Sequence, residues 1–272
     1  MIARVPIILL LAASLLYPGC SVKEDREHCP AMLRLNLPPA TESLESVYVR
    51  ITSPDGQESS HPVTLGKDNT VVSFPVSGDP FLCTVSSVDF KNDAVRVSEG
   101  EPFPQLFLYR KRLHVKGEFA ELTPVLAKEF CKLEVSLKPL PSTLSMTVRA
   151  AYCGQYAEGE LVPGAYAVHI DQGGVVRVPR QGDTSLMLDL KDAGGTVVRS
   201  FAIGEYMSEA GYDWNAASLE DISIDVDYAR SVIRVSAGLW SRTFDLKVLF
   251  SIGIPKITPI FAVHSEREWR NW

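Results

Sequence analysis

From Met32 onward the chain is built from short apolar-polar alternations that are repeatedly interrupted by turn residues. Residues 32–37 and 46–52 both alternate, and the second run ends at the turn sequence Pro54-Asp55-Gly56. Clusters of Gly, Pro, Asn and Asp separate further β-branched runs at intervals of about ten residues. Many short strands at this spacing, with prolines in connections and edge strands, are typical of an all-β sandwich or barrel.

A second unit of the same texture is expected to begin near residues 123–124. The segments 129–138 and 144–152 flank a proline-containing turn and predict a β-hairpin. In such a hairpin Cys131 and Cys153 lie directly opposite or diagonal to each other, and either register permits a disulfide. Two small buried hydrophobic residues are an equally good interpretation of this pair.

The remainder of the second unit predicts more strands and a single helical segment. Residues 203–211 are expected to be helical, with Gly211 ending the helix. In the run that starts at Ile222, apolar residues alternate with polar ones, so Asp225 and Asp227 are expected on a solvent-facing side. No repeat with the period of a solenoid is present. Strands are expected at 165–170, 174–179, 184–190, 195–202, in a hairpin over 221–240, and at 242–250.

The first nineteen residues predict a signal peptide. Arg4 precedes an apolar run from Val5 to Leu16, about a dozen residues, whereas a membrane-spanning helix needs roughly twenty. Pro6 and Pro18-Gly19 disfavour a buried helix. Residues 1–19 are therefore left out of the reasoning about the fold.

Gly19-Cys20 resembles the lipobox of bacterial lipoproteins, in which cleavage leaves the cysteine as the first mature residue. The resemblance implies cleavage between Gly19 and Cys20, with a diacylglycerol and an N-acyl lipid on Cys20 and no other cofactor. Tyr17 and Pro18 depart from the usual aliphatic and small residues of the motif. Ordinary signal-peptide cleavage, which would leave the Cys20 thiol free, is the alternative.

Charge and cysteine count exclude some classes of partner and site. Lys and Arg number 27 against 33 Asp and Glu, a net charge of −6, which becomes −7 once Arg4 is removed with the signal. With no long basic run, nucleic acid is not an expected partner. If Cys20 carries lipid, four cysteines remain, enough for two disulfides in three connectivities. No CxxC spacing occurs, so no metal site is expected.

A search for catalytic motifs indicates no enzyme and no catalytic residue. The sequence contains no HExxH, GxSxG, GxxxxGK[ST] or GxGxxG pattern. Asp225 and Asp227 share one face of a strand, where a glycosidase could place acids, but the solvent face of a sheet explains them better. Tyr212 and Trp214 form either a carbohydrate-stacking platform or an aromatic corner packed over the sheet. The histidines show no metal-ligand spacing; they are His28, His61, His114, His169 and His264.

Several of these segments together are similar to the fimbrillin-associated anchor lipoproteins of Bacteroidota, of the minor-fimbria anchor type. Order and spacing agree over roughly residues 15–250. The matching segments are Cys20 to Arg26 (CSVKEDR), Cys29-Pro30, the alternating Leu33, Leu35 and Leu37, residues 123–137 (TPVLAKEFCKLEVSL) and residues 200–240.

The resemblance implies two tandem transthyretin-like antiparallel β-sandwich domains behind a lipidated tether. The expected limits are 1–19 for the signal peptide, 20–30 for the tether, 31–125 and 126–250 for the sandwiches, and 251–272 for a C-terminal extension. The extension reads either as an added edge strand or donor segment or as a frayed tail.

The resemblance also implies a function. Lys23, Glu24 and Asp25 resemble a lipoprotein export signal, although a solvated charged tether would look the same. The implied protein is a cell-surface lipoprotein of the outer membrane that anchors a fimbria (pilus) and limits or seeds its assembly. Fimbrial subunits are the implied partners, joined by strand addition at a sheet edge. A surface glycan-binding lipoprotein that uses Tyr212 and Trp214 is the alternative.

Overall fold

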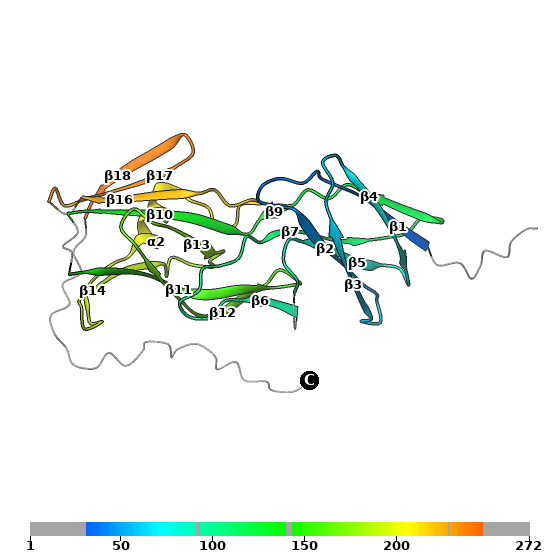
Figure 1. Cartoon of the computed structure of the whole chain (residues 1–272), viewed down its shortest axis with the longest axis horizontal. Coiled ribbons are helices and arrows are strands. Elements are labelled where there is room, and N and C mark those ends of the chain that lie inside the picture. Colours follow the sequence, from blue (N-terminus) through cyan, green and yellow to red (C-terminus); the bar gives the residue numbers. More distant parts are fainter. Residues whose placement is uncertain (1–30, 91–92, 140–142, 228, 247–272) are drawn as a thin grey trace, which may run out of the picture.

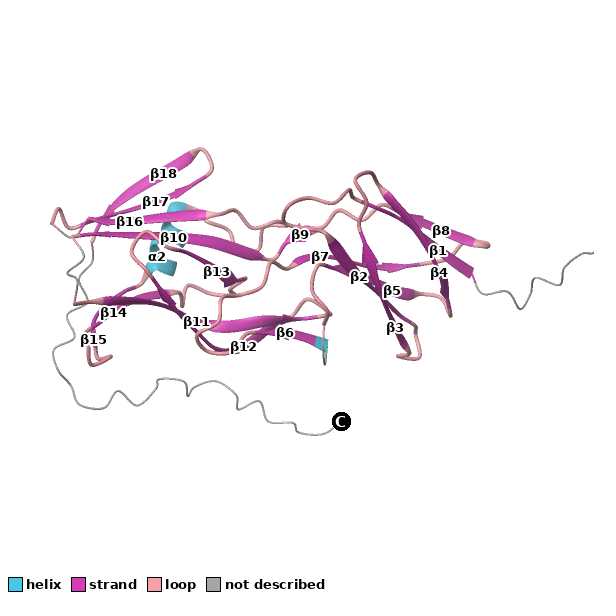
Figure 2. Ribbon diagram, in the orientation of Figure 1, coloured by secondary structure: helices cyan, strands magenta, loops and turns pink. Residues whose placement is uncertain are grey.

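The computed structural model describes residues 31–90, 93–139, 143–227 and 229–246. Almost all of its elements are strands, and α2 (Ile203–Ala210) is the α-helix among the described residues (Figure 1, Figure 2). The strands form four sheets, which face each other in pairs as two β-sandwiches along the long axis of the molecule (Figure 1). The expected all-β fold with two tandem sandwiches is therefore confirmed.

The first sandwich pairs a three-stranded sheet with a five-stranded one. Leu33, Leu35 and Leu37 are fully buried between them, because alternate residues of a strand point to the same face. The three-stranded sheet has the order β4 (Thr70–Val76), β1 (Ala31–Leu37), β8 (Phe119–Leu122). The five-stranded sheet has the order β3 (Glu58–Thr64), β2 (Ser46–Thr52), β5 (Phe81–Ser86), β7 (Phe107–Leu113), β9 (Ala127–Lys128).

The second sandwich is larger, and α2 adds Tyr206 and Met207 to its core. Gly211 caps this helix in the left-handed conformation, as expected from the sequence. One sheet has the order β13 (Val175–Pro179), β10 (Phe130–Lys138), β16 (Ile222–Asp227), β17 (Val232–Ala237), β18 (Trp240–Asp245). The other has the order β12 (Leu161–Ile170), β11 (Ser145–Tyr156), β14 (Met187–Lys191), β15 (Val197–Phe201), and β6 (Ala94–Arg96) also pairs with β11.

The hairpin expected from residues 129–138 and 144–152 does not form. These segments become β10 and β11, which lie in different sheets: β10 pairs with β13 and β16, whereas β11 pairs with β12, β14 and β6. The chain crosses from one layer of the sandwich to the other between them. Both strands bury apolar residues. Because they lie in opposite layers, the apolar face of each strand packs against the core between the two sheets.

The two sandwiches are built on the same strand plan. In the first, β1 pairs antiparallel with β4 and parallel with β8; in the second, β10 pairs antiparallel with β13 and parallel with β16. The facing sheets match as well, with β3-β2-β5-β7 corresponding to β12-β11-β14-β15. Each sandwich thus contains one parallel strand pair, a detail that antiparallel alternation alone did not predict.

The registers of the two sandwiches also match. Leu33 lies opposite Ala120 on β8, and Leu133, 100 residues further on, lies opposite Ile222 on β16. The sequences LRLNL at 33–37 and LEVSL at 133–137 therefore occupy equivalent strands, as do SVYVR at 46–50 and SMTVR at 145–149. What distinguishes the second sandwich is α2 and the β17–β18 hairpin, which extends its sheet beyond β16.

Elements of the two sandwiches cross over at their junction. The short strand β6 comes before the last strands of the first sandwich but pairs with β11 of the second, and β9 pairs with β7 of the first. The domain limits expected at 125/126 stay a prediction. Because β6 pairs with the second sandwich and β9 with the first, backbone hydrogen bonds link the two sandwiches on both sides of this limit. An apolar cluster fills the junction: Phe90, Val95, Phe103, Leu106, Leu108, Phe130 and Ala157.

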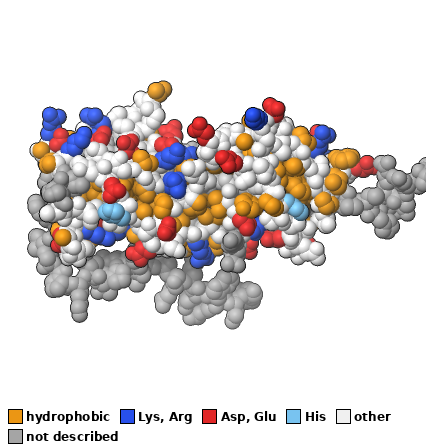
Figure 3. Space-filling view, in the orientation of Figure 1, with side chains coloured by type: hydrophobic (Ala, Val, Ile, Leu, Met, Phe, Trp, Pro, Cys, Tyr) orange, Lys and Arg blue, Asp and Glu red, His pale blue; other side chains and the backbone are white. Residues whose placement is uncertain are grey.

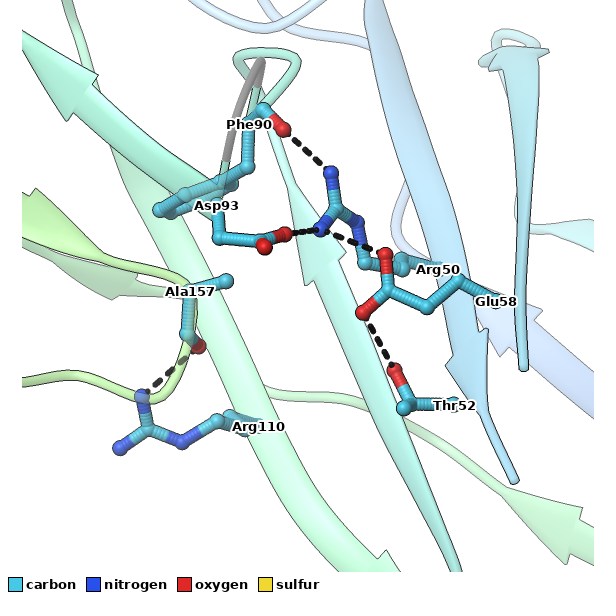
Figure 4. Close-up of polar contacts among 7 residues, drawn as sticks. All are labelled: Arg50, Thr52, Glu58, Phe90, Asp93, Arg110 and Ala157. Carbon is cyan, nitrogen blue, oxygen red and sulfur yellow. Dashed lines mark hydrogen bonds and ion pairs between the residues drawn. The ribbon is translucent and has the colours of Figure 1, made fainter. Parts of the chain in front are cut away.

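Polar contacts of two arginines from the first sandwich support this junction (Figure 4). Arg50 on β2, with its side chain only 11% exposed, pairs with Glu58 at 3.0 Å and Asp93 at 2.6 Å and donates to the Phe90 carbonyl oxygen. Arg110 on β7 donates to the Ala157 carbonyl oxygen at 2.9 Å. The segment that leads into β6 is thereby held to the sheet of β2.

Candidate functional site

The described residues contain no cluster that resembles a metal centre. No group of three or more His, Cys, Asp or Glu side chains within residues 31–90, 93–139, 143–227 and 229–246 could hold a metal ion. Asp225 is exposed on β16 and Asp227 is partly exposed, where Arg230 pairs with it at 3.6 Å. Their expected placement on the solvent-facing side of the sheet is confirmed.

The possible disulfide between Cys131 and Cys153 is absent. Cys83, Cys131 and Cys153 are free thiols. Cys131 lies opposite Val178 on β13 and points into the core, whereas Cys153 on β11 lies against the Val162 carbonyl oxygen at 3.8 Å. The pairing was inferred from a hairpin that does not form, and the alternative of small, largely buried residues holds for both.

Tyr212 and Trp214 form a buried corner and no binding platform. Each side chain is 8% exposed, and their rings meet edge to face with centroids 4.9 Å apart. The Tyr212 hydroxyl donates to the Glu220 carbonyl oxygen at 3.0 Å. A sugar could not stack on rings whose faces are already packed in the core, so of the two alternatives for this pair the structure shows the aromatic corner packed over the sheet.

The residues expected to carry the lipid and the export signal lie outside the described part of the chain. These are Gly19, Cys20, Lys23, Glu24 and Asp25. Within the described residues no helix has the length and apolar content to cross a membrane.

The candidate interaction site is the edge of the first sandwich formed by β8. This strand ends its sheet among the described residues, and it is only four residues long. Its backbone groups on the side away from β1 therefore have no strand partner in the described structure, and such an edge is a template for pairing with another chain.

The outer face beside this edge is partly apolar. Met32 lies opposite Pro75 on β4 and Phe119 on β8, and the Phe119 side chain is 59% exposed. One step along, Arg34 pairs with Glu121 at 3.5 Å, an exposed pair worth little to stability. In Figure 3 apolar side chains are visible at the end of the molecule that carries β1 and β4, and basic and acidic side chains are interspersed elsewhere on the face in view.

A shallow hollow adjoins the same strand. It has a volume of about 350 Å³ and is lined by Arg34, Asn36, Val71, Glu121, Leu122 and Thr123. The site therefore combines an open strand edge, exposed apolar side chains and one ion pair. These features suit a polypeptide partner better than they suit a small substrate, because the hollow is shallow and its two charged side chains, Arg34 and Glu121, already pair with each other.

Comparisons with known proteins identify the fold. The fimbrial anchor protein Mfa2 from Porphyromonas gingivalis matches 78% of this chain and 99% of its own, with a TM-score of 0.54 and 9% identity. The chain has the fold of a fimbrial anchor protein. At 9% identity this match speaks for the fold and leaves partners and chemistry open.

Other solved structures with the fimbrial-anchor fold agree. A Bacteroides thetaiotaomicron protein described as a candidate polysaccharide-binding protein (DUF1812) matches 79% of this chain and 98% of its own, with a TM-score of 0.61 and 9% identity. A candidate adhesin from the same species matches 78% and 97%, with a TM-score of 0.55 and 12% identity. No family model matches the chain, and no curated protein sequence matches it. The similarity to anchor lipoproteins seen in the sequence is thus supported at the level of the fold.

The sequence did not predict the β8 edge, nor the junction contacts of Arg50 and Arg110. β8 is too short to show a convincing alternation, and Phe119 looks like a core residue from sequence. The signal available in the sequence was the similarity between residues 33–50 and 133–149, which indicates two units with the same strand plan. Comparing the neighbours of equivalent strands in the structure then shows which edge is open.

Proposed function

We propose that this protein is a lipid-anchored, non-catalytic component that attaches a fimbria to the outer membrane at the cell surface and limits or seeds its assembly. The observation that carries the proposal is the fimbrial-anchor fold over nearly four fifths of the chain, together with the Gly19-Cys20 motif ahead of the first sandwich. The structures with which the chain shares its fold are named for anchoring, adhesion or polysaccharide binding.

In this proposal the lipid is the diacylglycerol and N-acyl group on Cys20, and no other cofactor takes part. The tether of residues 20–30 spans at most about 40 Å when extended, and it leads directly into β1 at Ala31. A single acyl chain gives only marginal membrane binding, whereas the two or more chains of a bacterial lipoprotein hold it stably. Lys23, Glu24 and Asp25 would direct the lipoprotein to the cell surface.

The partner in this proposal is a fimbrial subunit that adds a strand to a sheet edge. Backbone hydrogen bonds along the edge supply affinity, and pockets for alternate side chains supply selectivity. The observation in support is that sheets whose apolar faces are already packed have open edges among the described residues.

Membrane attachment is tested with Cys20→Ala in the full-length protein. The variant is expected in the soluble fraction of lysed cells, and the wild type in the outer-membrane fraction. Cys153→Ala is the matched control, since it removes a cysteine that is not the expected lipid site. Retention of Cys20→Ala in the membrane fraction would contradict lipid anchoring.

Partner binding is tested by using the tagged wild-type protein as bait in outer-membrane extracts. Co-purification of a polymeric fimbrial subunit is the expected result. Recovery of the protein with polysaccharide and with no fimbrial subunit would instead favour the glycan-binding alternative, with a site other than Tyr212 and Trp214.

A further inference from the structure

The internal correspondence of the two sandwiches shows what is missing beside β8. Strands β1 and β8 of the first sandwich correspond to β10 and β16 of the second in order, direction and register. Beyond β16 the sheet continues with β17, which runs antiparallel to it. Beyond β8 the described chain supplies no such strand.

The burial of the inward-facing side chains of β16 and β8 differs accordingly. Ile222 and Ile224 on β16 are 2% and 0% exposed, covered in part by the neighbouring β17. Their counterparts on β8, Ala120 and Leu122, are only partly buried, although both pack against the core of the first sandwich. Apolar side chains that point inward yet stay partly exposed are what removal of a covering strand leaves behind.

The backbone of β8 has the matching vacancy in hydrogen bonding. The Met32 N–H donates to the Glu118 carbonyl oxygen at 2.9 Å, so the alternate residues 118, 120 and 122 direct their bonding groups toward β1. The groups of Phe119 and Glu121 therefore point away from β1. Glu121 corresponds to Ser223, which lies opposite Ser236 of β17.

We propose that the outer edge of β8 receives one antiparallel strand from a fimbrial subunit, in the register that β17 adopts on β16. This assignment rests on the proposed anchor function and names its binding edge. The incoming strand places its residues as Val235 and Ser236 are placed: an apolar side chain inward beside Leu122, and its neighbour opposite Glu121 on the outer face.

The outer face also selects the incoming strand by charge. Glu121 is 72% exposed at its side chain and already shares Arg34, at 3.5 Å. A hydroxyl or basic side chain opposite Glu121 is therefore favoured, and an acidic one is disfavoured because like charges directly opposite each other destabilise a strand pair. The exposed Phe119 offers an apolar contact for a residue further along the strand.

The test uses a fluorescent peptide with the sequence of residues 231–238, SVIRVSAG, which copies β17. Binding to the full chain is measured by anisotropy for the wild type, Glu121→Pro and Glu121→Ala. Proline removes the outward N–H of residue 121 and leaves the β1 ladder intact, because that N–H does not face β1. Alanine removes the carboxylate and keeps the N–H, so it is the matched control.

The expected result is binding by the wild type and Glu121→Ala, and at least a roughly tenfold weaker affinity for Glu121→Pro, from the lost hydrogen bond and the proline ring in the path of the strand. Equal binding by all three proteins, or no binding by the wild type, would overturn the proposal. Binding that appears only in a chain ending at Leu246 would also overturn it, because residues 247–272 would then be the natural occupant.

Two further measurements separate the possible failures. If Glu121→Pro does not fold, N-methylated peptides on the wild type replace it: methylation at the position of Ser236 abolishes binding in this register, whereas methylation at Val235 does not, and equal effects would refute the register. In the outer-membrane pull-down, recovery of the fimbrial subunit by the wild type but not by Glu121→Pro supports the edge. Recovery by both the wild type and Glu121→Pro rejects the edge and leaves the anchor function standing. Recovery by neither protein rejects the anchor function itself.

Discussion

Cys131 shows how completely a single side chain is committed to the interior of the second sandwich. Burial raises the pKa of its thiol from 9.0 to about 12, and the neighbouring Tyr212 hydroxyl has its pKa raised as well, again chiefly by burial. Both groups are neutral in the folded protein at physiological pH. Neither can act as a nucleophile there, which agrees with a structural role.

The stability of the fold should therefore decline at alkaline pH. A thiol whose pKa is higher in the folded state than in the unfolded state contributes its stability below the unfolded value, and this contribution is lost as pH rises from about 9 toward 12. Urea denaturation at pH 8 and pH 10.5 should show a smaller drop in unfolding free energy for Cys131→Ala than for the wild type. Cys153→Ala serves as the control, and equal drops in all three would contradict this assignment.

Residue types proved easier to foresee than residue neighbours. The alternation of β16 correctly placed Asp225 and Asp227 on the outside, because the side-chain period of a strand is fixed by the backbone. The fate of Tyr212 and Trp214 was left open, since their sequence is equally compatible with an exposed platform and a packed corner. Only the fold decides, by bringing Cys131 and Glu220 to these rings.

At the scale of elements, β6 depends on one glycine. Gly154 on β11 lies opposite Arg96, and a Cβ added there would lie 2.0 Å from the Val95 carbonyl oxygen. That contact is with backbone, which cannot rotate away as a side-chain end can. The closeness of the two strands is therefore possible only without a side chain at this position.

Gly154→Ala should detach β6 from β11. We expect the unfolding free energy to fall by about 1–3 kcal/mol, the usual range for overpacking a tight site. Hydrogen exchange should become faster in residues 94–96 while β16 stays protected. Gly66→Ala is the control, because an added Cβ there meets its nearest atoms at an ordinary 3.5 Å. Unchanged exchange at β6 would contradict the contact.

Strand positions followed from the sequence far better than strand pairing did. The segment 221–240 forms the expected hairpin, because its strands are joined by a short turn. The segments 129–138 and 144–152 are also close in sequence, yet they lie in different layers. Each is a central strand whose partners come from later in the chain, β16 for the first and β14 for the second. Local periodicity predicts which face of a strand is apolar, but it does not predict which layer of the sandwich contains the strand.

At the scale of the whole molecule, Phe103 links the two sandwiches. Its side chain is fully buried in the junction cluster, its N–H donates to the Arg177 carbonyl oxygen at 3.0 Å, and its own carbonyl accepts from Arg177 Nε at 2.6 Å. A residue placed before the last strands of the first sandwich is thus fastened to β13 of the second. The two halves share buried surface that neither has alone.

The described fold should consequently unfold as one unit, and Phe103→Ala should uncouple its halves. We expect a single calorimetric transition in the wild type and two in the variant, with a loss of about 3–5 kcal/mol from the emptied site. Phe119→Ala, which truncates an exposed ring, should leave the single transition and shift the unfolding free energy by no more than about 0.5 kcal/mol. Two transitions already present in the wild type would contradict the coupling.

The position of β1 has a mechanical consequence. The chain enters the first sandwich through a strand that is flanked on both sides, by β4 and by β8. A pull on the chain at Ala31, along the axis of β1, loads both hydrogen-bonded ladders in shear, so their bonds must fail together. An edge strand pulled from its side would instead unzip bond by bond at far lower force. A chain held at its N-terminus would thus be loaded through a central strand, which resists extraction better than an edge strand does.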